Sequence, residues 1–292
     1  MHHTLENVDR VEELLQRLTD DLPYEYKSLF PVDGFWAKRA SQKRLALLKR
    51  IDEALRPMLW PGERVMFLTS GVLVSFWESY FLGLPMYYLN RRALVLTNER
   101  LILVQIDSRR RPRELRSQVL LRAIAKVGST LLGNTTLKLQ AGKRYTIAYM
   151  QRRDRRSLSS LIESGRGQAT KDGAATAIEH LCPHCYAVVA DHPDACPSCR
   201  GAFKSSKVAG LRSLLFPGLG DIYIGHWRFA IVEILVASVV WLSVLLPDGE
   251  GAATAGDRLA AAPVVFLLLH VTDAIATRYV ARKGHYPAVG GS

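Results

Sequence analysis

Hydrophobic positions change their spacing along the chain, and each change marks a different kind of element. Residues 5–18 and 41–56 place leucine, valine and isoleucine at helical intervals, and Pro57 ends the second run. From Glu63 the interval moves towards two, in five apolar segments separated by Gly, Asn or charged turns. Residues 152–165 return to helical spacing. The pattern predicts two helices, a curled antiparallel sheet and one C-terminal closing helix, which together make an α+β fold.

Three local features within residues 57–165 resemble the bacterial pleckstrin-homology-like (PH-like) and GRAM-like domains. They are the Pro61-Gly62-Glu63 lead-in, the LTNxRL pattern of residues 96–101, and the ending of two strands and a helix. The resemblance implies a PH-like domain that binds lipids, peptides or copies of itself. It implies no catalytic activity.

The segment between the first two strands, residues 75–92, is longer and more aromatic than a hairpin loop requires. Aromatic rings with polar tips beside arginines are typical of segments at a lipid headgroup boundary. Trp77, Phe81 and Tyr87 are therefore candidates for an interfacial anchor. Filling the core of the sheet domain is the alternative role of these rings, and the sequence leaves both roles open.

Basic charge is concentrated in one stretch of the chain. The net charge is +12, from 39 Lys+Arg and 27 Asp+Glu, and residues 91–156 hold 17 of the basic and 4 of the acidic residues. Such a patch suits a phosphate-bearing partner, either anionic lipid or nucleic acid. A solvated surface that serves solubility is the alternative. The candidate lipid- or partner-binding face consists of Arg91, Arg92, Arg109, Arg110, Arg111 and Arg113.

Two CxxC pairs, ten residues apart, form the most specific motif of the sequence: Cys182, Cys185, Cys196 and Cys199. Four thiolates in such turns can enclose one tetrahedral zinc ion, Zn(2+), which then stabilises a segment too short to form a core. The pairs resemble the short zinc ribbons of many bacterial membrane and ribosome-associated proteins. A redox pair, an iron–sulfur site and disulfides are the alternatives, which the matched double motif disfavours. Because four thiolates leave no open coordination position, we expect a structural metal.

Two long apolar stretches follow, at residues 229–246 and 259–280. Each approaches the roughly 20 residues that a helix needs to cross about 30 Å of hydrocarbon, and a soluble core hairpin is the alternative. Lys and Arg residues flank the pair, whereas the loop between the two stretches is acidic, so the positive-inside bias predicts two cytoplasmic ends. The first residues lack the pattern of a cleaved secretory signal. We therefore expect a multi-pass protein of the bacterial inner membrane.

A Gly-rich turn precedes the first apolar stretch. It resembles that of a bacterial two-helix hairpin family with a Tyr-x-Gly step and an Asp in the second helix, here Asp273. Gly220-Asp221-Ile222 stands where that family has a basic or Asp-Arg-Phe tripeptide, so this chain departs from the pattern. The candidate turn residues are Gly218, Gly220, Tyr223 and Gly225.

Ionisable side chains within the apolar stretches are default functional candidates, because burying them in lipid is costly unless they are paired. Glu233 in the first stretch lies at a depth comparable to that of His270 and Asp273 in the second. We expect Glu233 to face one of these two residues across the hairpin. A structural hydrogen bond between the helices is favoured over a proton or ion relay, and both roles remain open.

These features predict a multidomain chain: an N-terminal helical region at residues 1–56, a PH-like domain at 57–165, a linker at 166–178, a zinc ribbon at 179–205 and a membrane hairpin at 208–284. The sequence carries no recognisable catalytic motif. We expect a non-enzymatic membrane adaptor or scaffold that recruits or regulates a membrane assembly, with anionic lipid and a protein partner or second copy as its partners. A small oligomeric pore or transporter subunit and a membrane tether for nucleic acid are the alternatives; Asp191, Asp194 and the lack of Lys or Arg between the cysteines weaken the tether.

Overall fold

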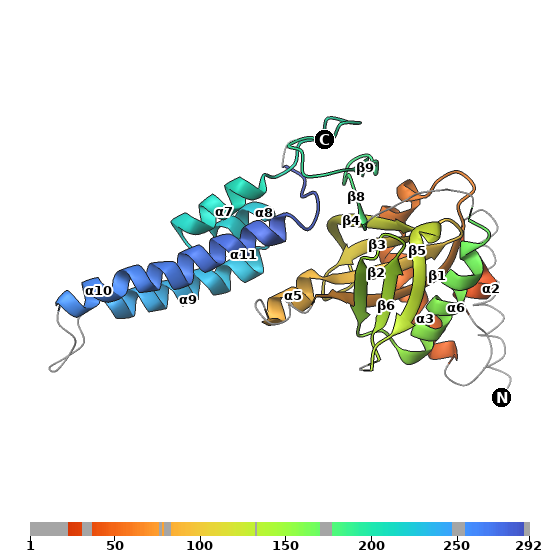
Figure 1. Ribbon diagram of the computed structural model, residues 1–292, viewed down its shortest axis with the longest axis horizontal. Helices are drawn as coiled ribbons and strands as arrows, with labels where there is room; N and C mark the ends of the chain where they lie inside the picture. The colour runs from red at the N-terminus through yellow and green to blue at the C-terminus, as the bar shows by residue number, and fades with distance from the viewer. Residues whose placement is uncertain are drawn as a thin grey trace, which may run out of the picture. The chain divides into compact units, whose positions relative to one another are not determined.

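The computed structural model describes residues 23–30, 37–75, 78, 83–131, 133–169, 177–246 and 255–288. The chain forms two compact units, Met1–His180 and Leu181–Ser292, whose elements are labelled in Figure 1. The helix expected at residues 5–18, and the aromatic residues Trp77 and Phe81, lie outside the described residues.

An antiparallel sheet forms the body of the first unit. Its strands follow the order β5-β6-β7-β1-β2-β3-β4, and the residues that pair along it confirm the predicted antiparallel sheet. β1 is shared, because its residues up to Val72 pair with β2 and its last residues pair with β7. The strands are β1 Val65–Val74, β2 Arg91–Thr97, β3 Arg100–Ile106, β4 Pro112–Leu120, β5 Ile124–Ser129, β6 Thr135–Leu139 and β7 Arg144–Ala148.

Helices that precede and follow these strands in the chain pack on the sheet. The closing helix predicted at 152–165 is α6, Arg152–Arg166, whose buried Leu158 and Ile162 join the core of the sheet. The helix predicted at 41–56 is α3, Ala37–Leu55, which begins four residues earlier than expected. The remaining helices are α2 Tyr26–Leu29, η1 Arg56–Met58, α5 Gly83–Leu89 and η2 Leu121–Ala123.

A buried ionic network fastens α3 to the sheet and to α6. Arg44 of α3 forms a 2.6 Å ion pair with Asp154 of α6, and Thr69 of β1 donates a 2.7 Å hydrogen bond to the same carboxylate. The Arg44 guanidinium also lies 4.4 Å from the centre of the Phe67 ring. Since one carboxylate receives both partners, α3, β1 and α6 are held in one core.

The two motifs that carry the resemblance to PH-like domains meet inside this unit. Glu63 of the Pro-Gly-Glu lead-in and Arg100 of LTNxRL form a 2.8 Å ion pair, and each side chain is 1% exposed. Thr97 donates to Glu63 at 2.7 Å, Arg100 also contacts Gln118, and its guanidinium lies 3.6 Å from the centre of the Trp60 ring. The residues of both motifs are therefore used to join the start of the domain to the β2–β3 corner.

The second unit contains a cysteine-bearing segment followed by helices. β8, Glu179–Leu181, leads into this unit, and β9, Val188–Val189, is its neighbour. The helices are α7 Ser206–Leu215, α8 Leu219–Ile224, α9 Trp227–Leu245, α10 Ala255–Phe266, the π-helical turn η3 Leu267–Val271 and α11 Thr272–Ala281.

Two of the helical stretches are long and apolar enough to cross a membrane. They are Trp227–Leu245, with a mean hydropathy of 2.1, and Ala260–Ala281, with 1.7, close to the predicted 229–246 and 259–280. They run side by side (Figure 1), and only 11% of each apolar window is buried. Since soluble core helices are mostly buried, this exposure favours contact with lipid over a soluble core.

The glycines of the turn allow α7 and α8 to pack closely. Gly218 and Gly225 bracket α8 with φ values of +88° and +98°, which L side chains rarely adopt. A Cβ on Gly220 would lie 2.3 Å from the Ala209 carbonyl oxygen and 2.8 Å from the Thr277 side chain. The Gly-rich signature therefore serves a close helix–helix contact.

Candidate metal centre and basic surfaces

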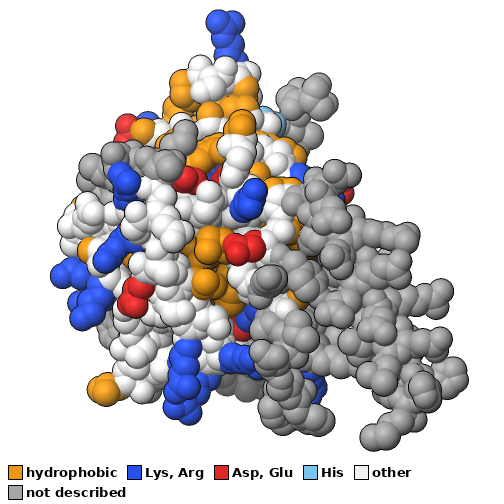
Figure 2. Space-filling view, turned by 90° about the vertical axis from the view of Figure 1, so that its right-hand side faces the viewer, with side chains coloured by type: hydrophobic (Ala, Val, Ile, Leu, Met, Phe, Trp, Pro, Cys, Tyr) orange, Lys and Arg blue, Asp and Glu red, His pale blue; other side chains and the backbone are white. Residues whose placement is uncertain are grey.

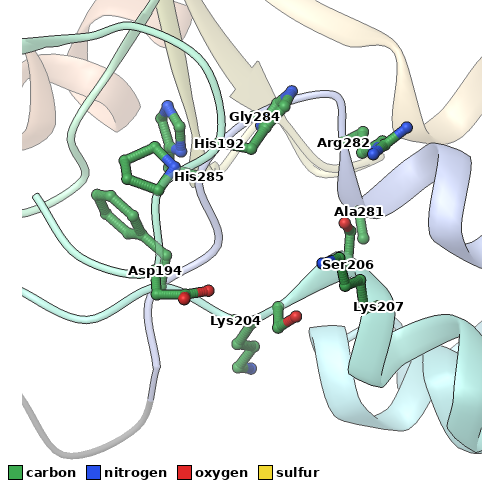
Figure 3. A pocket seen from close by; sticks show the side chains of 12 residues that line it. His192, Asp194, Lys204, Ser206, Lys207, Ala281, Arg282, Gly284 and His285 are labelled. Atoms are coloured by element: carbon green, nitrogen blue, oxygen red, sulfur yellow. The ribbon is translucent and has the colours of Figure 1, made fainter.

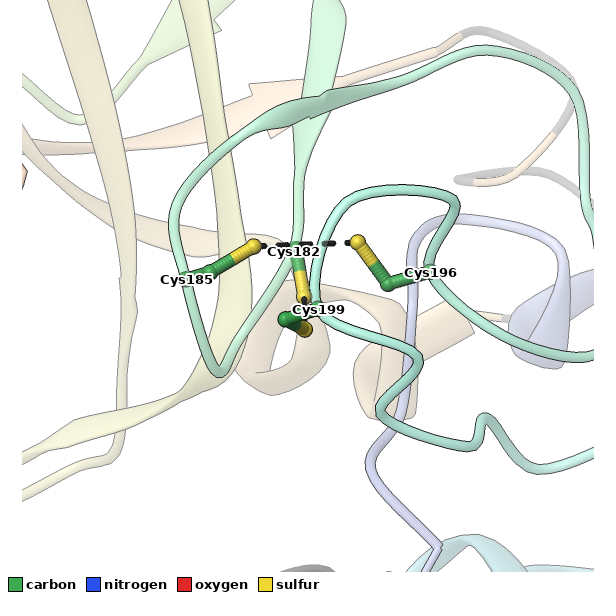
Figure 4. A group of neighbouring side chains, drawn as sticks. All are labelled: Cys182, Cys185, Cys196 and Cys199. Carbon is green, nitrogen blue, oxygen red and sulfur yellow. Dashed lines mark hydrogen bonds between the residues drawn. The ribbon is translucent and has the colours of Figure 1, made fainter.

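The four cysteines of the two CxxC pairs converge in the second unit (Figure 4). Their sulfur atoms all lie within 4.8 Å of one another, with Cys182–Cys199 at 3.8 Å and Cys185–Cys196 at 3.7 Å. A tetrahedral ion with Zn–S bonds of about 2.3 Å places its ligand sulfurs about 3.8 Å apart. The thiols are free rather than joined in disulfides. The arrangement therefore fits a four-thiolate metal site.

Both CxxC turns have the same local geometry. In the first, Cys182 N donates to the Ala187 carbonyl and Tyr186 N donates to the Cys182 carbonyl; in the second, Cys196 and Arg200 repeat these bonds. Tyr186 and Arg200, each four residues after its first cysteine, share a φ of +61°. The repeated turn brings each pair of thiols to the same side of the chain.

Burial and backbone hydrogen bonds give Cys182 and Cys196 thiols of different pKa. Burial raises the pKa of the Cys182 thiol to about 12. Burial also opposes ionisation of Cys196, but the backbone N–H groups of Cys199 and Ser198 lower the pKa of its thiol to about 7. A bound cation would stabilise the thiolate form of Cys182.

The apolar core around the cysteines is too small to hold this segment by itself. It comprises two of the four cysteines, Cys182 and Cys196, with Val189 and Phe203. Segments of this size usually depend on a metal or on disulfides for a stable fold. The residues present therefore suit a metal with a structural role.

A polar cluster lies among the helices of the second unit. Oxygens of Asp221 on α8, Glu233 on α9 and Asp273 on α11 all lie within 4.8 Å of one another. Glu233 thus lies beside Asp273, one of its two predicted partners. His270 is placed elsewhere: its Nε2 accepts a 2.9 Å hydrogen bond from Trp241, and its ring stacks on Phe266.

The hydrogen bonds of this cluster tie helices together. Thr277 on α11 donates to Asp221 at 2.9 Å, and the backbone N–H of Gly218 donates to Asp273 at 3.0 Å. Ser213 on α7 donates to Thr277 at 3.1 Å. These contacts favour a structural role for this polar cluster over a relay. Asp221 was missed as a cluster member in the sequence analysis, because only its place in the glycine turn drew attention to it.

Most of the predicted arginine face lies at one end of the sheet. Arg109, Arg111 and Arg113 are exposed in or beside the β3–β4 loop, and Arg110 there is half-buried. The pairing of Val72 with Arg91 and of Ile106 with Pro112 places half-buried Arg91 at the same end. The face of the molecule in Figure 2, on the right-hand side of Figure 1, carries separate Lys and Arg side chains with Asp, Glu and hydrophobic side chains between them.

Arg92 corrects this prediction, because its side chain faces inward. The residue is 5% exposed and donates a 2.8 Å hydrogen bond to the Leu89 carbonyl at the end of α5. Side chains alternate between the two faces of a strand, so neighbouring arginines on β2 have different surroundings. Arg92 supports the turn into β2 and is unavailable to a surface partner.

Tyrosines accompany the arginines at this end of the sheet. Tyr87, one of the predicted anchor residues, is half-buried, with its ring edge-to-face against Tyr149 at 4.9 Å and Tyr88 at 5.4 Å. Tyr149 is 70% exposed and Tyr88 48% exposed. Tyr149 follows β7 directly, and no pattern in the sequence indicated that its ring would contact Tyr87.

A second basic feature of the same unit was also missed in the sequence analysis. A cleft of about 440 Å³ is lined by Arg39, Lys43, Arg152 and Arg153, with Ala40 and Gln151, where the starts of α3 and α6 meet. Among the described residues, the lining of this cleft includes no Asp or Glu. The residues lie more than 100 positions apart, so only the path of the chain brings them together.

Comparison with known proteins identifies no family for this chain. No family model and no curated protein matches it. Among solved structures, the linker-DH/PH domains of p115-RhoGEF match with 12% identity and a TM-score of 0.30, over 47% of this chain and 43% of that chain. An N-terminally truncated form of the same domains matches with 13% identity and a TM-score of 0.30, over 47% and 44%. Similarity at this level assigns neither fold family nor function.

Proposed function

We propose that this protein is a non-enzymatic membrane adaptor whose first unit, a PH-like domain, reads anionic lipid. The observation that carries the proposal is the gathering of exposed and half-buried arginines with exposed tyrosines at one end of the sheet. We call this surface, formed by Arg91, Arg109, Arg111, Arg113, Tyr88 and Tyr149, the basic rim.

The chemistry of the basic rim suits a phospholipid surface. Each Lys or Arg near an anionic leaflet contributes about 1 kcal/mol of attraction, and this attraction weakens with salt. Exposed tyrosines add amphipathic rings that settle at the headgroup level. The cleft between α3 and α6 adds four further basic side chains to the same unit. Nucleic acid would be attracted by the same charges, and competition with lipid separates the two partners.

In this proposal the second unit attaches the protein to the membrane. The helices Trp227–Leu245 and Ala260–Ala281 would span the bacterial inner membrane, with both chain ends in the cytoplasm, and a structural Zn(2+) would hold the cysteine segment next to them. A protein partner or a second copy would then be recruited by the anchored first unit. A pore would require several copies, since two helices enclose no path of their own.

The proposal is tested by hydrogen exchange of the full-length chain in nanodiscs. We expect amides of residues 107–113 and 149–153 to exchange more slowly in discs containing phosphatidylglycerol than in discs of phosphatidylcholine. The triple variant Arg109→Glu, Arg111→Glu, Arg113→Glu should lose this difference. Added duplex DNA should leave the protection in phosphatidylglycerol discs unchanged.

A matched control variant makes the same change in net charge on a different surface of the first unit. Lys126, Lys138 and Lys143 are exposed on the β5–β6–β7 part of the sheet, and their change to Glu alters the net charge equally. This control should retain the protection. Equal exchange in the two kinds of disc, or an equal loss in both triple variants, would overturn the proposal.

A further inference from the structure

A cavity of about 290 Å³ opens within the second unit (Figure 3). Its walls come from residues 192–194 between the two CxxC pairs, residues 203–205 after the second pair, the first turn of α7, and the residues that end and follow α11. The lining residues that bear on its chemistry are Asp194, Lys204, Ser205, Ser206, Lys207 and Arg282.

The walls of this cavity are fixed by the chain that follows α11. The ring of His285 stacks on Phe203 with centres 4.6 Å apart. Lys204 N donates a 2.8 Å hydrogen bond to the Tyr286 carbonyl, and Ala288 N donates a 2.9 Å bond to the Ala202 carbonyl. The returning chain therefore pairs with the cysteine segment and holds Arg282 across from the start of α7.

The charge of the lining is positive. Lys204, Lys207 and Arg282 line the cavity together with one acidic residue, Asp194. Burial, and the nearby Arg282, lower the pKa of His192, while burial lowers that of His285, so both rings at the cavity are neutral at pH 7. With two basic residues in excess, the electrostatic environment favours an anion.

The hydrogen-bond donors of the cavity add to this charge. Ser205 and Ser206 line the cavity, and the Ser205 side chain makes no capping hydrogen bond at the start of α7. The first N–H groups of a helix lack partners within the helix, and they are donors suited to an anion. A lysine, an arginine, two hydroxyls and backbone donors together match the acceptor oxygens of a phosphate group.

We infer that this cavity binds a phosphate group, and that Lys207, Arg282, Ser205 and Ser206 are its principal contacts. The group is the headgroup phosphate of an anionic lipid or a free phosphate. The cavity lies beside Ala281 and Arg282, at the end of the second candidate span, where a lipid headgroup would lie if that span is embedded. This site is distinct from the basic rim, and it does not depend on the first unit.

The test uses the purified full-length chain in neutral detergent. Binding of inorganic phosphate and of short-chain phosphatidylglycerol is measured by the shift in thermal unfolding, and lipid retention is measured by native mass spectrometry. We expect at least one ligand to stabilise the chain, and the pair Lys207→Gln, Arg282→Gln to weaken that binding by about tenfold or more. Stabilisation by phosphate identifies a free phosphate site, whereas retention of lipid in excess phosphate identifies a headgroup site.

Two further variants keep the result interpretable. The pair Arg228→Gln, Arg278→Gln removes two exposed charges from the same unit outside the cavity and should bind as the unaltered chain does. If the first pair fails to fold, the pair Ser205→Ala, Ser206→Ala probes the cavity with no change of charge and should weaken binding. Absence of binding to both ligands, or equal loss in the Arg228 and Arg278 control, would overturn the inference. The triple variant of the basic rim should leave this binding unchanged, so the two proposals fail separately.

Discussion

Glu63 and Arg100 are each 1% exposed, and their charges are satisfied entirely by neighbours within the first unit. Removing one member of such a pair leaves the other charged group buried without its partner, and that cost exceeds the net value of the pair itself. The charge type of these residues suggests a surface role, but their burial assigns them to the core.

We predict that Arg100→Met lowers the free energy of unfolding by about 3–5 kcal/mol, because Glu63 loses its ion pair. The double variant Glu63→Met, Arg100→Met should recover part of this loss, since both charges are then removed. Denaturant unfolding of the full-length chain in detergent measures each change.

The exposed pair of Arg56 and Asp52 provides the control for this cycle. The Arg56 side chain is 48% exposed and the Asp52 side chain 26% exposed. Arg56→Met should therefore cost less than about 1 kcal/mol. Additive losses from the single variants at positions 63 and 100 would contradict the interpretation of a coupled pair.

At the scale of elements, the two CxxC turns form one structural unit around a proposed metal. Each turn repeats the same backbone hydrogen bonds, and these do not involve the thiols. The loss of one thiol would instead remove one ligand from the metal ion that the two turns would share. A segment with so small an apolar core then has little else to hold it together.

We predict that Cys196→Ser reduces bound zinc from about one ion per chain towards none, since a structural zinc site uses four ligands. It should also lower the thermal stability of the second unit. Metal analysis after purification without chelator measures the zinc content. Ser198→Ala, in the same turn, is the matched control and should retain the metal. A Cys196→Ser chain that keeps a full complement of zinc would contradict the four-thiolate assignment.

At the scale of the whole molecule, charge and hydropathy together suggest how the chain lies in a membrane. The excess of basic residues falls before the first candidate span and after the second, and the acidic loop joins the two. Positive charges favour the cytoplasmic side, so the two chain ends would share that side.

We predict opposite labelling of two single-cysteine reporters in right-side-out vesicles. Ala252→Cys, between the spans, should react with an impermeant maleimide before lysis, because the positive-inside bias places this loop outside. Lys143→Cys, in the first unit, should react only after lysis. Reaction of both reporters from the same side would contradict the predicted topology. A chain with the four native cysteines alone measures background labelling.

Features that depend on neighbours in the chain could be predicted from the amino-acid sequence. Alternation of apolar residues predicted the antiparallel sheet, helical spacing predicted α3 and α6, and the two apolar stretches predicted the candidate spans to within two residues. The spacing of the cysteines predicted their convergence, because each CxxC turn is a local structure. These patterns are readable because a helix or strand repeats within a few residues.

Contacts between residues far apart in the chain became visible only in the folded structure. Arg44 and Asp154 are 110 residues apart, Asp221 and Thr277 are 56 apart, and Lys207 and Arg282, which line one cavity, are 75 apart. Residue type also failed to separate buried Arg92 from half-buried Arg91, since the side of the strand that faces the core depends on the register of pairing. Such contacts depend on the path of the whole chain, and no local repeat encodes them.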